Sequence, residues 1–313
     1  MDEVGEAVGV QLRQGGHAPA LTPRNLFEID YIAPPPALSD YITTLYRFRC
    51  DESEIRDIQP AAIGQLALFP CGVGEMQFRD GRIDPSHRTN LLTPFSVAAP
   101  FMVDGPFHAI GAALSPLGWA ALTGRHAAEE GNRLVRAADW LGEEIEQLGA
   151  QLCDGYRAGE ISGHDCAMAL CDYIGRVARP VNERHAELIR ITNDWLGSSL
   201  NPKLSDLMER AAYSDRQVQR LVERYFGLPP QALARKYRAI RAAALLSFLV
   251  LTPDWEVQLA EAFFDQSHMI REIRLFVGRT PARLGDEESP YLNEMLDPKN
   301  LREIRMSTLD GAG

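Results

Sequence analysis

Two short segments of the sequence carry side chains suited to reading the edges of DNA bases. The first runs Ser214-Asp215-Arg216-Gln217-Val218-Gln219-Arg220, and the second runs Asp265-Gln266-Ser267-His268-Met269-Ile270-Arg271. A glycine and a proline follow each segment at the same spacing, so the two copies lie 51 residues apart. Arg and Gln can form paired hydrogen bonds with guanine and adenine in the major groove. The sequence therefore contains a duplicated candidate for base recognition.

Each copy has the signals of a helix with one polar face. Ser214 and Asp265 are favourable N-caps, because their side-chain oxygens accept hydrogen bonds from amides of the first turn. Gly227 and Gly278 suit the left-handed residue that ends a helix. Apolar residues recur at helical spacing on one face. The opposite faces carry the predicted base-reading residues, which are Arg216, Gln219 and Arg220 in the first copy and Gln266, Ser267, His268 and Arg271 in the second.

A shorter helix is predicted before each copy, which makes two helix-turn-helix units. Asn201 and Thr252 are the expected N-caps of these shorter helices, and a proline follows each in the first turn. From Pro230 to about Val250 the composition favours one continuous helix. About 21 residues at ~1.5 Å each span roughly 31 Å, close to the ~34 Å between successive major-groove faces. Such a rod can place the two units in neighbouring grooves.

The charge distribution agrees with an anionic partner for this region. The whole chain has a formal net charge of −11. Between residues 183 and 283, however, 15 Lys and Arg face 12 Asp and Glu, whereas the rest of the chain has 17 against 31. Six basic side chains are candidates for contacts with phosphates, which orient a protein on the duplex: Arg224, Lys236, Arg238, Arg241, Arg274 and Arg279.

This arrangement resembles the AraC/XylS family of transcription regulators over about 100 residues. The matching residues are Arg220, Gly227, Pro230, Leu233, Arg238 and Ala242, then Asp265-Gln266-Ser267-His268 with Arg271, Gly278, Thr280 and Pro281. The resemblance implies a sequence-specific regulator that binds double-stranded DNA, with a small-molecule effector, RNA polymerase and a second copy of the chain as further partners. One departure is the stretch Ala262-Phe263-Phe264, where the family usually has a glycine.

The region before residue 180 has a different texture. Short β-rich runs at Tyr41–Cys50, Ala62–Phe69, Glu75–Phe78 and Phe107–Leu114 predict a small antiparallel sheet or open barrel. Helical spacing follows in Leu134–Leu152 and Cys166–Ile174, whose apolar stripes are the expected dimer surface. The predicted class is α+β. Its expected parts are an irregular segment 1–33, a cupin-like sensor or dimerisation domain 34–180, an all-helical DNA-binding domain 181–285 and an acidic tail 286–313.

Aromatic residues of the predicted sheet have two readings. They can line an apolar effector pocket, or they can form the core of the sheet domain. The pocket candidates are Tyr46, Phe48, Phe69, Phe78, Phe107 and Trp119.

The other chemical signals in the sequence are weaker. The histidines have no compact metal-ligand spacing, so no metal or cofactor is expected. The five cysteines include no Cys-x-x-Cys pair and indicate reduced thiols in a cytoplasmic protein. No secretory signal, membrane span or catalytic motif is recognised. The alternative to a regulator is an effector-binding protein or enzyme whose helical domain no longer binds DNA.

Overall fold

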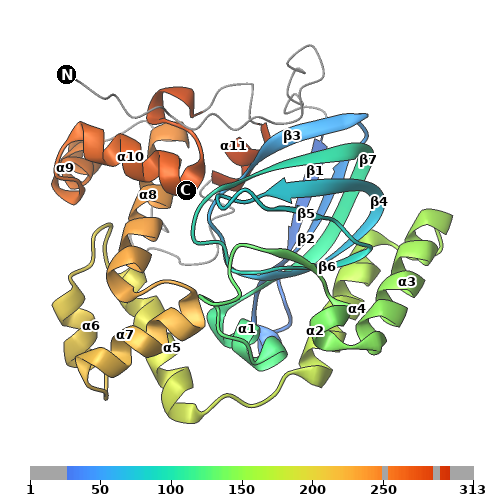
Figure 1. Ribbon diagram of the computed structural model, residues 1–313, viewed down its shortest axis with the longest axis horizontal. Coiled ribbons are helices and arrows are strands. Elements are labelled where there is room, and N and C mark those ends of the chain that lie inside the picture. The colour runs from blue at the N-terminus through green and yellow to red at the C-terminus, as the bar shows by residue number, and fades with distance from the viewer. Residues whose placement is uncertain (1–26, 249–252, 285–289, 297–313) are drawn as a thin grey trace.

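A computed structural model describes residues 27–248, 253–284 and 290–296 (Figure 1). A sheet with helices against it forms the N-terminal part, and a string of helices forms the C-terminal part beside it. The predicted α+β class, with an open antiparallel sheet followed by an all-helical region, is confirmed.

Within the described residues, eight strands form one antiparallel sheet. The order of its strands is β1-β2-β7-β4-β6-β8, with β3 paired to β7 and β5 paired to β4. Strand β7 pairs with β3 near its start and with β2 near its end, and register shifts in β4 interrupt the pairing of β4 with β7. The bounds are β1 Phe27–Ile32, β2 Ile42–Cys50, β3 Glu54–Gln59, β4 Gln65–Gln77, β5 Ile83–Pro85, β6 Thr89–Leu92, β7 Ala99–Leu114 and β8 Leu134–Arg136.

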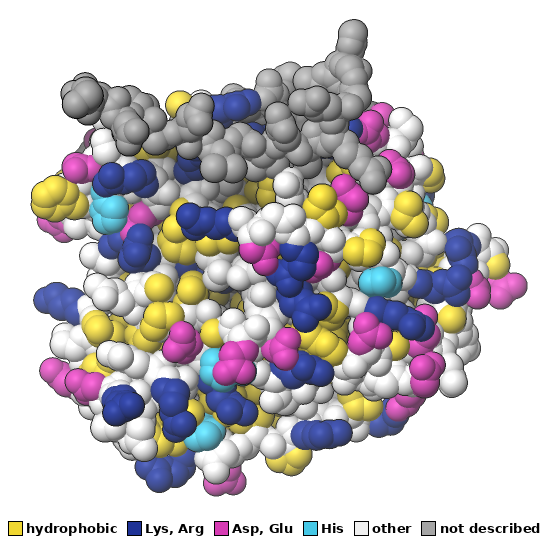
Figure 2. All heavy atoms as spheres, in the orientation of Figure 1, with side chains coloured by type: hydrophobic (Ala, Val, Ile, Leu, Met, Phe, Trp, Pro, Cys, Tyr) yellow, Lys and Arg dark blue, Asp and Glu magenta, His cyan; other side chains and the backbone are white. Residues whose placement is uncertain are grey.

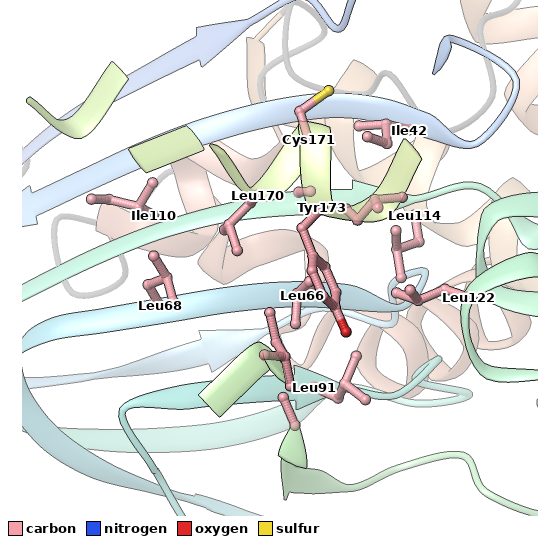
Figure 3. Close-up of a cluster of buried hydrophobic side chains, with 14 of the residues drawn as sticks. Ile42, Leu66, Leu68, Leu91, Ile110, Leu114, Leu122, Leu170, Cys171 and Tyr173 are labelled. Atoms are coloured by element: carbon pink, nitrogen blue, oxygen red, sulfur yellow. The ribbon is translucent and has the colours of Figure 1, made fainter. Parts of the chain in front are cut away.

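Four helices pack against this sheet and close its main core. They are α1 Pro116–Thr123, α2 Ala138–Leu141, α3 Glu143–Ala158 and α4 Gly163–Val177. Leu66 and Ile110 of the sheet meet Leu170 and Tyr173 of α4 in a fully buried cluster (Figure 3). The apolar stripes that were expected to form a dimer surface therefore pack on the sheet of the same chain. That expectation was wrong because a sheet with one apolar face needs the same stripes for its own core.

The C-terminal part contains the two predicted helix-turn-helix units. After α5 Glu183–Gly197, the first unit is α6 Leu204–Arg210 with α7 Asp215–Phe226. The long helix α8 Pro230–Phe248 leads to the second unit, α9 Pro253–Ala262 with α10 Gln266–Val277. Short 3-10 turns lie at Pro36–Leu38 and Pro281–Arg283, and a last helix, α11, spans Pro290–Leu296. In Figure 1 the two units lie at opposite ends of α8, on one side of the sheet.

Several local expectations differ from the structure. Strand β1 lies inside the segment that was expected to be irregular, and Leu134 begins a strand rather than a helix. The N-cap of α6 is Lys203, because the Asn201 side chain accepts a hydrogen bond from Arg238 instead. The segment expected to be an acidic tail contains α11. The predicted cap Thr252 lies outside the described residues.

None of the helices in the described parts of the chain combines the length and apolar character needed to cross a bilayer.

Candidate nucleic-acid interface and adjoining pocket

Helix α7 begins and ends at the residues that the sequence predicted, Ser214 and Gly227. Gln217 accepts a hydrogen bond from the Ser214 amide at 3.3 Å, which forms a capping box at the N-terminus. Gly227 ends the helix at φ +83°, in the left-handed region. Val218, Leu221 and other apolar residues of α7 are buried against α1, α5 and α8. This packing fixes which face of α7 points outward.

The outward face of α7 carries the predicted base-reading residues. Arg216, Gln219 and Arg220 are all exposed, and Arg224 is exposed near the end of the same helix. The pKa of His185 on α5 is lowered, first by burial and then by Arg224, Arg220 and Arg184. Figure 2 shows Lys and Arg side chains gathered over α5–α7, at the lower left. The first unit thus presents a positive surface.

Helix α10 also has a side-chain N-cap and a C-terminal glycine, but one of its predicted base-reading residues is partly buried. Asp265 accepts a hydrogen bond from the His268 amide at 2.7 Å, and Gly278 ends the helix at φ +90°. Gln266, Ser267 and Arg271 are exposed as predicted. His268 is half-buried, because it contacts Glu272 instead of pointing wholly into solvent.

Glu272 is the centre of a buried ionic cluster. The carboxylate is 1% exposed and accepts from Arg235 at 2.6 Å, from Arg238 at 2.6 Å and from His268 at 3.0 Å. Burial raises the pKa of Glu272, but the hydrogen bonds and charges of Arg235 and Arg238 outweigh it and hold the pKa below its ordinary value. Glu272 is therefore ionised at neutral pH. It joins α10 to α8.

Three of the predicted phosphate contacts are buried. Lys236 donates to the Ala62 carbonyl at 3.1 Å, Arg238 pairs with Glu272, and Arg241 donates to the Leu196 carbonyl at 2.6 Å. Burial lowers the pKa of Arg241 to about 10. These charges hold α8 in place, so their burial does not fit contact with phosphate. Sequence alone missed this because a basic residue on a helix is usually exposed.

Arg224, Arg274 and Arg279 remain candidates for phosphate contacts. Arg224 and Arg274 are exposed, and Arg279 is partly exposed just after Gly278. All three lie near the C-terminal end of a recognition helix.

Backbone hydrogen bonds connect both recognition helices to the sheet domain. The Ala127 amide donates to the Arg224 carbonyl at 2.7 Å, at the end of α7. The Ala98 and Ala61 amides donate to the carbonyls of Leu275 at 3.1 Å and Phe276 at 2.8 Å, in α10. These bonds lie at the C-terminal ends of the helices, whereas the predicted base-reading residues lie toward the N-terminal ends.

A pocket of about 120 Å³ opens into the sheet domain. Four of the six aromatic candidates line it: Tyr46, Phe48, Phe69 and Phe107. The Tyr46 hydroxyl donates to Gln65 Oε1 at 2.7 Å, and burial raises the pKa of Tyr46. The polar lining residues are Thr43, Thr44, Gln59, Gln65, Glu75 and Ser86. The pocket is therefore apolar with a few hydrogen-bonding groups, as ligand sites commonly are.

The other two candidates lie elsewhere. Phe78 packs edge-on against Phe95, with ring centroids 5.4 Å apart, in a separate core cluster. Trp119 of α1 is 1% exposed and packs in the main core. These two residues therefore belong to the core of the sheet domain and do not line the pocket.

Sequence reasoning missed Tyr291 and Met295 of α11, which also line the pocket. In the sequence they come after the second helix-turn-helix unit, far from the predicted strands of the sheet domain. Only the apolar pairs at spacing four in Tyr291-Leu292-Asn293-Glu294-Met295-Leu296 indicated a helix with a buried face.

The cysteines show no sign of activation for nucleophilic chemistry. Burial raises the pKa of all five thiols, to about 12 for Cys153 and about 11 for Cys166. Reactive cysteines need a lowered pKa. Among the described residues, no group of His, Cys, Asp and Glu is arranged to hold a metal ion.

Residues 207–286 match the family described as a helix-turn-helix domain. No curated protein matches the chain. Solved structures of low identity are similar over most of their length. ToxT from Vibrio cholerae O395 has 9% identity, covers 84% of this chain and 98% of its own, and has a TM-score of 0.44.

Two further structures are similar at the same distant level. Unsaturated fatty acid-bound ToxT from Vibrio cholerae strain SCE256 has 9% identity, coverage of 77% and 95%, and a TM-score of 0.42. The AraC-like transcriptional activator CuxR has 10% identity, coverage of 70% and 88%, and a TM-score of 0.28.

Proposed function

We propose that this chain is a sequence-specific DNA-binding transcription regulator, because residues 207–286 match a helix-turn-helix domain family and the duplicated sequence pattern resembles the AraC/XylS family. One observation carries the proposal: two capped helices at opposite ends of α8 expose the Arg, Gln and Ser residues that the duplicated sequence marks for base reading. The 19 residues of α8, at ~1.5 Å each, span roughly 28 Å. That length approaches the ~34 Å between successive major-groove faces.

The sheet domain supplies the control in this proposal. Its pocket holds a small-molecule effector, and its hydrogen bonds to α7 and α10 tie both units to that domain. Effector binding then shifts the population between arrangements of the two units. The regulator acts on double-stranded DNA in the cytoplasm, as a homodimer in contact with RNA polymerase, and it has no enzymatic activity.

Selection of bound fragments from random DNA by the full chain tests the proposal. We expect one recurring site that covers two adjacent major-groove segments. Arg220→Ala and Arg271→Ala should each reduce the preference at a few base positions by about 5- to 150-fold, since a good bidentate contact is worth about 1–3 kcal/mol. The matched control is Arg157→Ala, which removes an exposed arginine on α3 of the sheet domain. Selection of no recurring sequence would overturn the proposal.

A further inference from the structure

Helix α11 has two faces that belong to two different parts of the molecule. Tyr291 and Met295 are one turn apart and line the pocket of the sheet domain. Leu292 and Leu296 are also one turn apart and are fully buried, in a cluster with α8 and α10. A single helix that follows the DNA-binding domain therefore connects the pocket with the core of the second helix-turn-helix unit.

The Tyr291 side chain occupies the pocket in the manner of a bound ligand. Its ring packs edge-on against Phe101 at 5.1 Å and Phe48 at 5.7 Å between centroids. Its hydroxyl donates to Gln59 Oε1 at 2.8 Å. An aromatic ring with one hydroxyl thus has both apolar and polar partners there, which shows what chemistry the pocket accepts.

The sheet domain also holds the beginning of α11. Asp57 of β3 is buried and accepts hydrogen bonds from the amides of Tyr291 at 2.8 Å and Leu292 at 3.4 Å. These amides are first-turn donors that lack partners within a helix. Asp57 therefore caps α11 from another domain, and these two hydrogen bonds exist only while α11 is seated.

The size of the pocket limits what can enter while α11 is seated. Its volume of about 120 Å³ is below the roughly 150 Å³ of a cavity that accepts one benzene molecule. A larger ligand needs the space that Tyr291 fills. Because that ring lies between Phe48 and Phe101, its departure would extend the pocket with an aromatic wall.

The charged side chains that line the pocket indicate which class of ligand it can bind. Among the described residues that line the pocket, none is Lys, Arg or His, and Glu75 is the sole carboxylate. Burial of an anion without a partner is costly, and Glu75 adds repulsion. Hydrogen bonds are available from uncharged groups such as Gln59, Gln65 and Tyr46. The site fits an uncharged ring compound with a hydroxyl or carbonyl group.

We propose that α11 is an internal occupant of the effector pocket, and that an uncharged aromatic ligand displaces Tyr291 and so releases the second helix-turn-helix unit. This inference rests on the proposed function, because it names the ligand class and the coupling element of the same pocket. When Tyr291 and Met295 leave the pocket, Leu292 and Leu296 leave the core around α8 and α10 with them. Ligand binding and loosening of α10 are then one event.

Two fluorescent probes with the same ring system test the ligand class. N-phenyl-1-naphthylamine is uncharged, and 1-anilinonaphthalene-8-sulfonate carries a sulfonate. In the full chain, Tyr291→Ala should bind the uncharged probe at least tenfold more tightly than wild type, since no ring has to be displaced. Tyr291→Phe keeps the ring and should bind like wild type. The inference would be overturned if Tyr291→Ala and wild type bound the uncharged probe with equal affinity. It would also be overturned if Tyr291→Ala bound the sulfonate probe more tightly than the uncharged probe.

Hydrogen exchange of the wild-type chain tests the coupling without a substitution. Saturation with N-phenyl-1-naphthylamine should speed exchange of the Tyr291 and Leu292 amides and of the amides of α10, while the Ile110 amide in the sheet core stays protected. Unchanged or slower exchange at Tyr291 and Leu292 would contradict displacement. Both measurements are independent of DNA. If no site is selected from random DNA but these results hold, only the regulator proposal fails.

Discussion

The two helix-turn-helix units share a sequence pattern but differ in what stabilises them. The first unit buries Leu221 in an apolar core made with α1, α5 and α8. At the position 51 residues later, the second unit has Glu272, buried in a cluster with Arg235, Arg238 and His268. The core of the second unit also includes Ala61 of the sheet domain and two leucines of α11.

The two units also differ in how they contact the sheet domain and α11, which determines which unit can respond to the pocket. Within the described residues, the first unit accepts a backbone hydrogen bond from Ala127 and packs on Leu117 and Ala120 of α1, but its apolar core does not include α11. The second unit contacts the sheet domain through Ala61 and Ala98, and a methyl group added at Gly278 would lie 2.5 Å from Ile58. A displacement of α11 is therefore transmitted to α10 first.

The largest expected effect is the loss of the charge at the centre of the second unit. Glu272→Ala leaves the buried guanidinium of Arg238 without its carboxylate. Breaking a buried ion pair in this way costs about 3–5 kcal/mol. Urea unfolding of the full chain should show that loss, with α10 becoming unprotected in hydrogen exchange before α7.

The control for Glu272→Ala is Glu209→Ala, which removes an exposed carboxylate from the first unit. Its cost should lie within about 0.5 kcal/mol. A small loss for Glu272→Ala, or equal loosening of α7 and α10, would show that the two units are not stabilised differently.

The second expected effect concerns the cap that the sheet domain gives to α11. Burial raises the pKa of Asp57 to about 7, although three backbone amides and Arg279 act in the opposite direction. The folded state thus holds a proton that the unfolded chain has lost above its ordinary pKa of 3.8. The contribution of Asp57 to the free energy of unfolding is fully present below pH 3.8, and it is lost as the pH rises through about 7. Between pH 5 and 8 the loss should be about 3 kcal/mol, at ~1.4 kcal/mol per unit.

Asp57→Asn isolates this contribution, because the amide oxygen can still accept from Tyr291 and does not titrate. The free energy of unfolding should fall from pH 5 to pH 8 in wild type and less so in the variant. The lowered pKa of His185 acts with the opposite sign below pH 6.5, but it is common to both proteins. Identical pH profiles would mean that Asp57 is not a titrating group in this range.

The sequence predicted the elements whose signals are local. Ser214, Asp265, Gly227 and Gly278 were assigned correctly, because caps and left-handed ends depend on neighbouring residues alone. The exposed positions of α7 followed from its helical period.

Features that depend on distant partners were not predictable in the same way. The burial of Lys236 and Arg241 depends on carbonyl groups 174 and 45 residues away in the chain. The role of Tyr291 depends on residues of β3 and β7 more than 180 positions before it. The stripes of α3 and α4 had the correct period, but a period does not say whether the covering surface is a sheet or a second chain.

The smallest expected effect compares the two N-caps, the feature in which the units are most alike. Ser214→Ala removes a neutral cap from α7, whereas Asp265→Ala removes a cap that also places negative charge at the N-terminus of α10. Each should cost about 1 kcal/mol in urea unfolding, with the larger loss for Asp265→Ala at low ionic strength. Ser205→Ala, at an exposed position in α6, should cost less than either. If added salt left the difference between the two cap variants unchanged, the extra loss at Asp265 would reflect its hydrogen bond to the His268 amide rather than its charge.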